Sequence, residues 1–175
     1  MECDIRMNFN KHWKYLKYVV RHKYYVFQEC RKLGVSFRQA LLHDISKFRH
    51  DEWEAYAEFF YGDHRNRKRK NNEVDFTDDY KTNFDYAWNY HLKRNPHHWQ
   101  YWILHFDSGD MDVLEMPDRY RKEMLADWRG AGKAQGRNDI QAWYLQHGVE
   151  MKLHENTRKW IEEQLGVSIA NVEVG

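Results

Sequence analysis

The stretch FRQALLHDISKF, residues 37–48, carries apolar side chains at helical spacing with a carboxylate among them. Phe37, Leu41 and Phe48 follow one face of a predicted helix, and Asp44 lies on that face between Leu41 and Phe48. An ionised carboxylate directed at an apolar core is destabilising unless something compensates its charge. The pattern therefore predicts a buried partner or a bound cation at Asp44.

The segment before this stretch is also typical of a helix. Apolar positions recur at helical spacing through residues 10–33, and Gly34 follows as a predicted helix end. Ser36, with Gln39 three residues later, predicts a capping box at the start of the next helix.

Further helix starts are predicted along the chain from residue types that favour N-termini. Asp51 with Glu54 predicts a second capping box. Asn95 predicts an N-cap with Pro96 in the first turn of the segment NPHHWQYWILHF, and Pro117 predicts another helix start.

The fold expected from these segments is all-α. Apart from the last few residues, no segment shows strand alternation between hairpin turns. We expect a single compact helical bundle of seven or eight helices over residues 1–175. The polar segment 63–83, which runs from basic to acidic, predicts an exposed charged loop or insertion.

Composition narrows the class of protein. With 28 basic and 27 acidic residues, the net charge argues against a nucleic-acid partner and against recruitment to a membrane surface. No apolar run is long enough to span a membrane, and the N-terminus lacks the apolar core of a signal peptide. Cys3 and Cys30 predict free thiols, so we expect a cytoplasmic protein.

Ligand-type residues stand on three more predicted apolar stripes, as Asp44 does on the first. They are His91, Asp127 and, at the edge of its stripe, His22. A single inward His is more often an ordinary core residue than a ligand, and a single Asp can serve as a helix cap or pair with Arg. Four such residues on four helices each need a buried partner, and one or two divalent cations would serve all of them.

The order of these residues resembles the HD-domain superfamily of metal-dependent phosphohydrolases. Residues 22–48, HKYYVFQECRKLGVSFRQALLHDISKF, are similar to its opening segment, with a His, about twenty residues, then His-Asp and a Lys. The motifs HDISKF, NPHHWQYW and EMLADW are also similar to those of an uncharacterised family of phage and bacterial proteins, from about residue 12 to 165. Ser46 stands where HD proteins usually have Gly.

The resemblance implies a set of metal ligands. The first metal would be held by His22, His43, Asp44 and Asp127, with Asp44 bridging to a second metal held by His91 and His98. Two alternatives stay open, since His97 is a rival of His98 and His12 is a rival of His22. The His and carboxylate set suits Mn, Fe, Co or Zn, with Mg as a further option.

Three other residues are candidates near this set. Lys47 and Arg94 are candidate phosphate contacts, together with His97, and Lys47 joins Asp44 as a candidate catalytic residue. Glu123 lies four residues before Asp127, where it could orient a ligand His, although a surface carboxylate is the preferred interpretation.

The expected function is hydrolysis of a small-molecule phosphate ester, with a nucleotide favoured, by water activated on the metal. A di-iron HD-type oxygenase and a non-catalytic helical binding or host-interaction protein are the alternatives. The sequence does not decide the oligomeric state.

Overall fold

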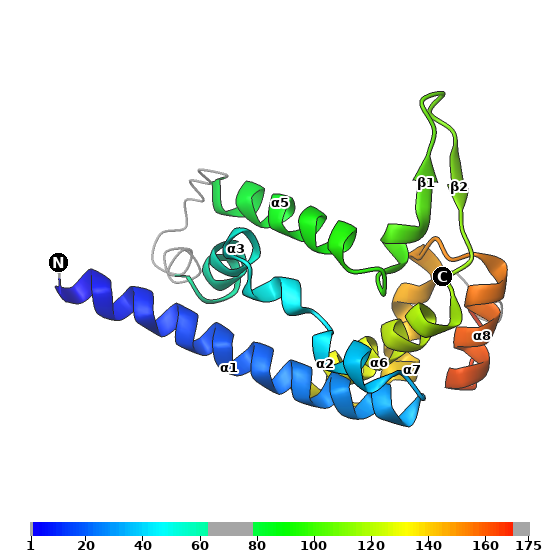
Figure 1. The fold of residues 1–175 in the computed structure, drawn as a ribbon, viewed down its shortest axis with the longest axis horizontal. Coiled ribbons are helices and arrows are strands. Elements are labelled where there is room, and N and C mark those ends of the chain that lie inside the picture. Colours follow the sequence, from blue (N-terminus) through cyan, green and yellow to red (C-terminus); the bar gives the residue numbers. More distant parts are fainter. Residues whose placement is uncertain (1, 63–78, 170–175) are drawn as a thin grey trace. The chain divides into compact units, whose positions relative to one another are not determined.

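The computed structural model describes residues 2–62 and 79–169, and within these ranges it describes side chains except at 2–9 and 79 (Figure 1). The elements in chain order are α1 (Glu2–Lys32), α2 (Phe37–Leu42), η1 (Ile45–Phe48), α3 (His50–Tyr61), α5 (Asp79–Arg94), η2 (Trp99–Trp102), β1 (Ile103–His105), β2 (Met111–Val113), α6 (Asp118–Ala134), α7 (Ile140–His147), η3 (Gly148–Glu150) and α8 (Glu155–Leu165). The described residues thus contain seven α-helices and a two-stranded sheet, which confirms the all-α prediction.

The chain divides into two compact units. The first unit comprises residues 1–21 and 44–94, and the second comprises 22–43 and 95–175. Helix α1 contributes residues to both units, and the second boundary falls between His43 and Asp44. The prediction of one domain over 1–175 stays a prediction.

The first unit has an aromatic core. Tyr15 and Val19 of α1 are buried with Tyr56 and Ala57 of α3 and with Ala87 of α5. Helices α3 and α5 lie side by side (Figure 1). Tyr15 and Val19 are four residues apart, so they lie on one face of α1. Trp53, Tyr56 and Ala57 similarly share one face of α3.

The second unit has two clusters of buried side chains. One joins Val26 and Cys30 of α1 to Ala40 of α2 and Ala126 of α6. The larger cluster joins α6, α7 and α8, and its buried members are Met116, Met124, Leu125, Tyr144, Met151, Ile161 and Leu165.

The predicted stripe from Phe37 to Phe48 is wrong as a helix face. Helix α2 ends at Leu42, and Phe37, Leu41 and Phe48 are exposed. Ser36 does cap α2, because its Oγ accepts the Gln39 N–H at 3.3 Å. Asp44 follows the helix with φ +55°, in the left-handed region, and is nevertheless 1% exposed. The burial of Asp44 was predicted from its place on a helix face, but Asp44 lies beyond the end of α2.

The helix predicted from Asn95 is also wrong. The chain turns at 96–98, forms η2, and then enters a hairpin in which Ile103 pairs with Val113 and His105 with Met111. Gly109, with φ +89°, allows the tight connection between the strands. Strands of three residues are too short to produce a period-two pattern that stands out from the sequence.

Two predicted boundaries need correction. Helix α3 begins at His50 with Arg49 as N-cap, and Asp51 pairs with Arg94 instead of capping. Helix α5 begins at Asp79, so the predicted loop over 63–83 is wrong at its end, while 63–78 lies outside the described residues.

Two simpler expectations concern the thiols and the membrane. Cys30 is a buried free thiol, and burial, partly offset by the charge of His43, raises its pKa to about 12. The side chain of Cys3 lies outside the described residues. Within the described segments, no helix has the length and apolar character needed to cross a membrane.

Candidate metal centre

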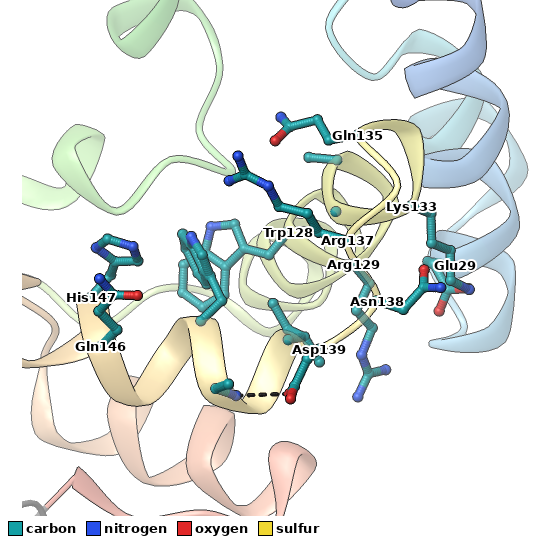
Figure 2. Close-up of a pocket in the computed structure, with 15 residues that line it drawn as sticks. Glu29, Trp128, Arg129, Lys133, Gln135, Arg137, Asn138, Asp139, Gln146 and His147 are labelled. Atoms are coloured by element: carbon teal, nitrogen blue, oxygen red, sulfur yellow. Dashed lines mark hydrogen bonds and ion pairs between the residues drawn. The ribbon is translucent and has the colours of Figure 1, made fainter.

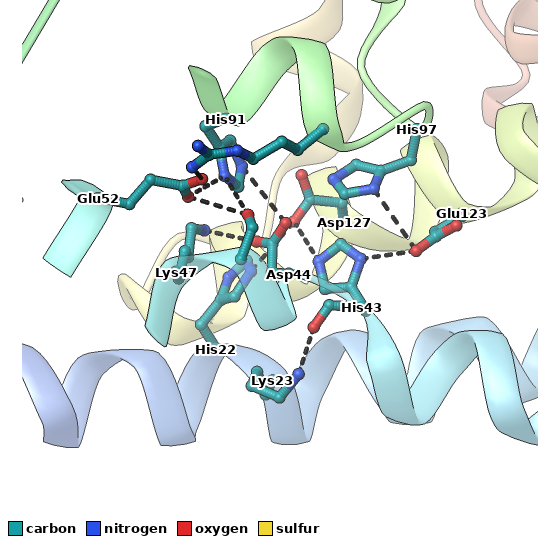
Figure 3. A network of polar contacts seen from close by, with 12 residues as sticks. His22, Lys23, His43, Asp44, Lys47, Glu52, His91, His97, Glu123 and Asp127 are labelled. Carbon is teal, nitrogen blue, oxygen red and sulfur yellow. Dashed lines mark hydrogen bonds and ion pairs between the residues drawn. The ribbon is translucent and has the colours of Figure 1, made fainter. Parts of the chain in front are cut away.

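Three ligand-type side chains converge in the second unit (Figure 3). The Nε2 atoms of His22 and His43 lie 3.2 and 3.3 Å from the same atom, Asp127 Oδ1. Both imidazoles are 2% exposed. Ligand atoms about 2.1 Å from a tetrahedral ion lie about 3.4 Å apart, so the two N–O separations match those around a small cation.

Local structure brings each of these residues to the centre. His22 shares the buried face of α1 with Val19 and Val26. His43 is the C-cap of α2, and the Lys23 ammonium donates to the carbonyls of Leu41, at 3.3 Å, and of His43. Lys23 therefore satisfies carbonyl groups that the end of the helix leaves without intrahelical partners.

Glu123 orients His43 from the side away from Asp127. His43 Nδ1 lies 3.0 Å from Glu123 Oε1, and Glu123 is 5% exposed. Burial raises the pKa of Glu123, but the hydrogen bond from His43 and the charge of His97 outweigh it, so the pKa lies below its ordinary value. An ionised Glu123 can only accept, so His43 Nδ1 must donate.

This contact decides what His43 presents to Asp127. A neutral His43 that donates from Nδ1 has a lone pair on Nε2, and that lone pair faces a carboxylate oxygen. Two acceptors at this distance need either a proton between them, on the ring or on the carboxyl group, or a cation that both can bind. His22 faces the same oxygen, and its ring centroid is 5.6 Å from that of His43.

Protonating both rings would place two positive charges close together in a buried site, which is destabilising. One divalent cation would serve both imidazoles and the carboxylate at once. The donor set of two imidazoles and a carboxylate therefore fits a transition metal such as Zn, Mn, Fe or Co.

Glu123 is held in turn by two other side chains. The Gln39 amide donates to Glu123 Oε2 at 2.6 Å and to the Arg119 carbonyl at 3.1 Å. His97 Nδ1 lies 3.5 Å from Glu123 Oε1, and its ring centroid is 4.4 Å from that of His43. Glu123 is thus a buried orienting carboxylate, and the preferred surface interpretation of the sequence is wrong.

The first unit contains a matching arrangement around Asp44. His91 Nε2 lies 3.3 Å from Asp44 Oδ1, and His91 Nδ1 lies 2.9 Å from Glu52 Oε2 (Figure 3). His91 and Glu52 are completely buried. Lys47 donates to Asp44 Oδ2 at 2.5 Å, one turn along the chain. As in the second unit, an imidazole lies between two carboxylates.

Hydrogen bonds and neighbouring charges shift the pKa values of Glu52 and His91 in this first-unit set. Burial raises the pKa of Glu52, but the hydrogen bonds from His91 and Arg94 outweigh it and lower the pKa. Burial lowers the pKa of His91, but the charge of Asp44 and the hydrogen bonds with Asp44 and Glu52 raise it overall. The protonated, positively charged form of His91 is therefore favoured between Asp44 and Glu52.

The predicted site residues fall into these two sets. His22, His43 and Asp127 lie together in the second unit, whereas Asp44 and His91 lie together in the first. The predicted bridging role of Asp44, and the pairing of His91 with His97 or His98, stay predictions.

The sequence left two pairs of alternative ligands open, and the members of each pair differ in their surroundings. His97 is 2% exposed and contacts Glu123, whereas His98 is half-buried beside it, with ring centroids 4.3 Å apart. His12 accepts the Trp53 indole N–H at 3.0 Å in the first unit, while His22 lies against Asp127 in the second.

The sequence prediction missed Glu52, and the predicted role of Arg94 as a phosphate contact stays a prediction. The Arg94 guanidinium donates to Asp51 at 2.6 Å and to Glu52 at 2.8 Å, so it holds Glu52 in place. Glu52 lies one turn before the buried Tyr56 on α3, and this i, i+4 spacing was the signal available in the sequence.

A sequence profile described as a family of unknown function (DUF5662) matches residues 11–167. The chain belongs to this family. The matched region contains all the candidate ligands, from His22 to Asp127. No curated protein matches the chain, and neither does any solved structure.

Proposed function

We propose that the protein is a metal-dependent phosphohydrolase that acts on a phosphate ester, with a nucleotide as the favoured substrate. The observation that carries the proposal is the convergence of His22 and His43 on one carboxylate oxygen of Asp127. The Glu123 contact supports it, because ligating imidazoles usually donate their other N–H to a carboxylate, and that contact directs the Nε2 lone pair of His43 toward Asp127.

The proposal assigns the metal to His22, His43 and Asp127 and adds Asp44 as a fourth ligand. Asp44 follows His43 by one peptide bond, and the order of these four residues resembles that of HD-domain phosphohydrolases. His91 and either His97 or His98 are the proposed ligands of a second ion. A bound divalent ion lowers the pKa of its water toward neutrality and so supplies a hydroxide nucleophile.

The side chains of the protein have separate tasks in this proposal. Glu123 keeps the Nδ1 proton of His43, so that Nε2 remains a ligand. Lys47 is the proposed phosphate contact, and its ammonium is held in place by Asp44. Because Arg94 is already shared between Asp51 and Glu52, we assign it to the support of Glu52 and not to the substrate.

The test combines metal quantification with a phosphate-release screen. Purified protein is expected to hold a transition metal and to release phosphate from at least one nucleotide when Mn is added. Asp127→Asn should lose metal and activity together, because it removes the carboxylate that both imidazoles face. Glu163→Gln, an exposed carboxylate change in the same unit, is the matched control.

Retention of metal and full activity by the Asp127→Asn variant would contradict the proposal. Bound iron with turnover that depends on O2, and no phosphate release, would favour the oxygenase alternative. Absence of metal and of activity in the wild-type protein would favour a binding protein.

A further inference from the structure

The second unit contains a pocket that none of the proposed metal ligands lines. It has a volume of about 650 Å³ and lies between the end of α6, the turn that follows and α7 (Figure 2). This volume is in the range of small-molecule sites, about 300–1,000 Å³.

The turn after α6 gives the pocket a fixed rim. Gly136 has φ +75°, its N–H donates to the Lys133 carbonyl at 3.1 Å, and the Arg137 N–H donates to the Gly132 carbonyl at 2.8 Å. This pair of bonds is a Schellman motif. A Cβ at Gly132 would lie 2.7 Å from the Arg137 carbonyl oxygen, so glycine is needed for the close approach. The backbone of Arg137 is therefore held firmly at the pocket.

Aromatic rings form one wall of the pocket. Trp128 of α6 and Trp143 of α7 have ring centroids 5.3 Å apart with their planes inclined at 55°, and His147 lies 5.3 Å from Trp143. Both indoles are only partly buried, although they pack on the larger core cluster. Their inclination excludes a flat ligand sandwiched between them, but each offers ring surface on which a flat ring system can stack.

The charges around this wall are mainly positive. Arg129, Lys133 and Arg137 line the pocket with two acids, Glu29 and Asp139. Lys133 pairs with Glu29 at 2.6 Å, and the Asp139 carboxylate accepts the Ala142 N–H as the cap of α7. Both acids therefore have structural partners.

Arg137 is the cation best suited to meet a ligand. Its side chain is exposed, and it has no hydrogen bond or ion pair to any side chain in the described segments. An Arg on a fixed backbone can donate two parallel hydrogen bonds to a phosphate or a carboxylate.

We propose that this pocket binds a planar aromatic anion, with its ring on the tryptophan wall and its anionic group at Arg137. The site is additional to the proposed metal centre and does not depend on it. Side-chain amides of Gln135, Asn138 and Gln146 at the pocket could bond the polar edge of such a ring.

The test is calorimetric titration of the full-length protein with AMP, adenosine and inorganic phosphate. AMP should bind, and the two fragments should each bind at least about tenfold more weakly, because each lacks one of the two recognised groups. Arg137→Ala should weaken AMP binding about tenfold, and Arg137→Lys should recover part of the loss. Arg38→Ala, which removes an exposed arginine of the same unit that does not line the pocket, should bind AMP as the wild type does.

The Asp127→Asn variant separates this site from the metal centre. It should retain AMP binding, since Asp127 does not line the pocket. Loss of AMP binding in Asp127→Asn but not in Arg137→Ala would overturn the proposal, as would equal affinity for AMP and inorganic phosphate. Failure of AMP to bind the wild-type protein would also overturn it, and none of these results bears on phosphate release.

Discussion

At the scale of single residues, His43 shows how one hydrogen bond decides the chemistry of a ring. Its Nδ1 is fixed as a donor by Glu123, so in the neutral ring Nε2 carries the lone pair, which is directed at Asp127. His22 repeats the approach to the same oxygen. Replacing one buried group in this set therefore changes the charge balance of the others.

Glu123→Gln tests the orienting role. The amide keeps the shape of the carboxylate but loses the charge that fixes the Nδ1 proton of His43. We expect metal affinity to fall about 10–100-fold, the usual effect of losing such a partner. Metal competition with a chelator measures this loss, with Glu163→Gln as control. Unchanged affinity would show that Glu123 does not orient a ligand.

Asp44 combines a left-handed backbone with a buried carboxylate. Asn tolerates positive φ better than Ala, so Asp44→Asn should lose less stability than Asp44→Ala, by about 1 kcal/mol. Both variants lose the ionic contacts to Lys47 and His91, and under the proposed function both should lose metal. Urea unfolding compares their stabilities, and equal midpoints would mean that backbone strain at Asp44 is negligible.

The burial of His91 and His22 could be predicted because polar residues at apolar positions stand out in a sequence, whereas the burial of Asp44 was predicted from a helix face that the structure does not contain. Glu52 could not be singled out, since its spacing from Tyr56 is shared by many surface carboxylates on helices. Only tertiary packing distinguishes Glu52 from exposed neighbours such as Asp51.

At the scale of elements, α1 and α6 approach closely within the second unit. A Cβ at Gly130 would lie 2.5 Å from Val26 Cγ2 and 2.6 Å from the Val26 nitrogen. Three residues further along each helix, Lys133 pairs with Glu29 at 2.6 Å. The contact between α1 and α6 thus depends on the absence of a side chain at Gly130 and, about one turn further on, on the ion pair between Lys133 and Glu29.

Gly130→Ala tests the close contact through the sign of its effect. In an exposed helix, Gly to Ala stabilises by about 0.5–1 kcal/mol. Here the added methyl group collides with backbone atoms of α1, so we expect a loss of about 1–3 kcal/mol in the free energy of unfolding. An increase in stability would show that α1 and α6 do not approach as closely as described.

Glu29 gives this contact a pH dependence. Burial raises the pKa of Glu29, but hydrogen bonds from Lys133 and Lys32 outweigh it and hold the pKa below its ordinary value of 4.5. Its contribution is therefore complete above pH 4.5 and is lost as pH falls through the folded-state pKa. At pH 7 the free energy of unfolding of Glu29→Gln should be lower than that of the wild type by at most about 1 kcal/mol. This gap between the two proteins should narrow below pH 4.5. Urea titrations at both pH values measure the gap; a gap that widens in acid would contradict this assignment.

Elements were predictable where several signals agreed. Gly34, with φ +76°, and the Ser36 cap mark a real helix boundary. The end of α2 at Leu42 has no such signal, because the sequence continues with residues that fit a helix. The hairpin was missed because residues 95–102 carry strong helix-start features, whereas its own strands are very short.

At the scale of the whole molecule, the two units contain the same combination of groups. Glu123, His43 and Asp127 are arranged in the second unit as Glu52, His91 and Asp44 are in the first. Each buried imidazole faces a carboxylate on both sides. In the first unit, Lys47 and Arg94 offset the charges of Asp44 and Glu52. In the second unit, Glu123 and Asp127 beside neutral imidazoles leave excess negative charge, which a bound divalent cation would neutralise.

Metal binding should therefore stabilise the folded chain. At a free metal concentration about 100 times Kd, binding adds about 2.7 kcal/mol to stability. For a chain of this size each kcal/mol corresponds to about 2–4 °C in Tm, so a chelator should lower Tm by about 5–10 °C. Differential scanning calorimetry of metal-loaded protein, with and without chelator, measures the shift.

Asp127→Asn should melt at the same temperature in both conditions, since its metal is already absent. A chelator shift of equal size in Asp127→Asn and wild type would locate the stabilising metal elsewhere, and no shift in metal-loaded wild type would exclude a metal from the buried His22, His43 and Asp127 set.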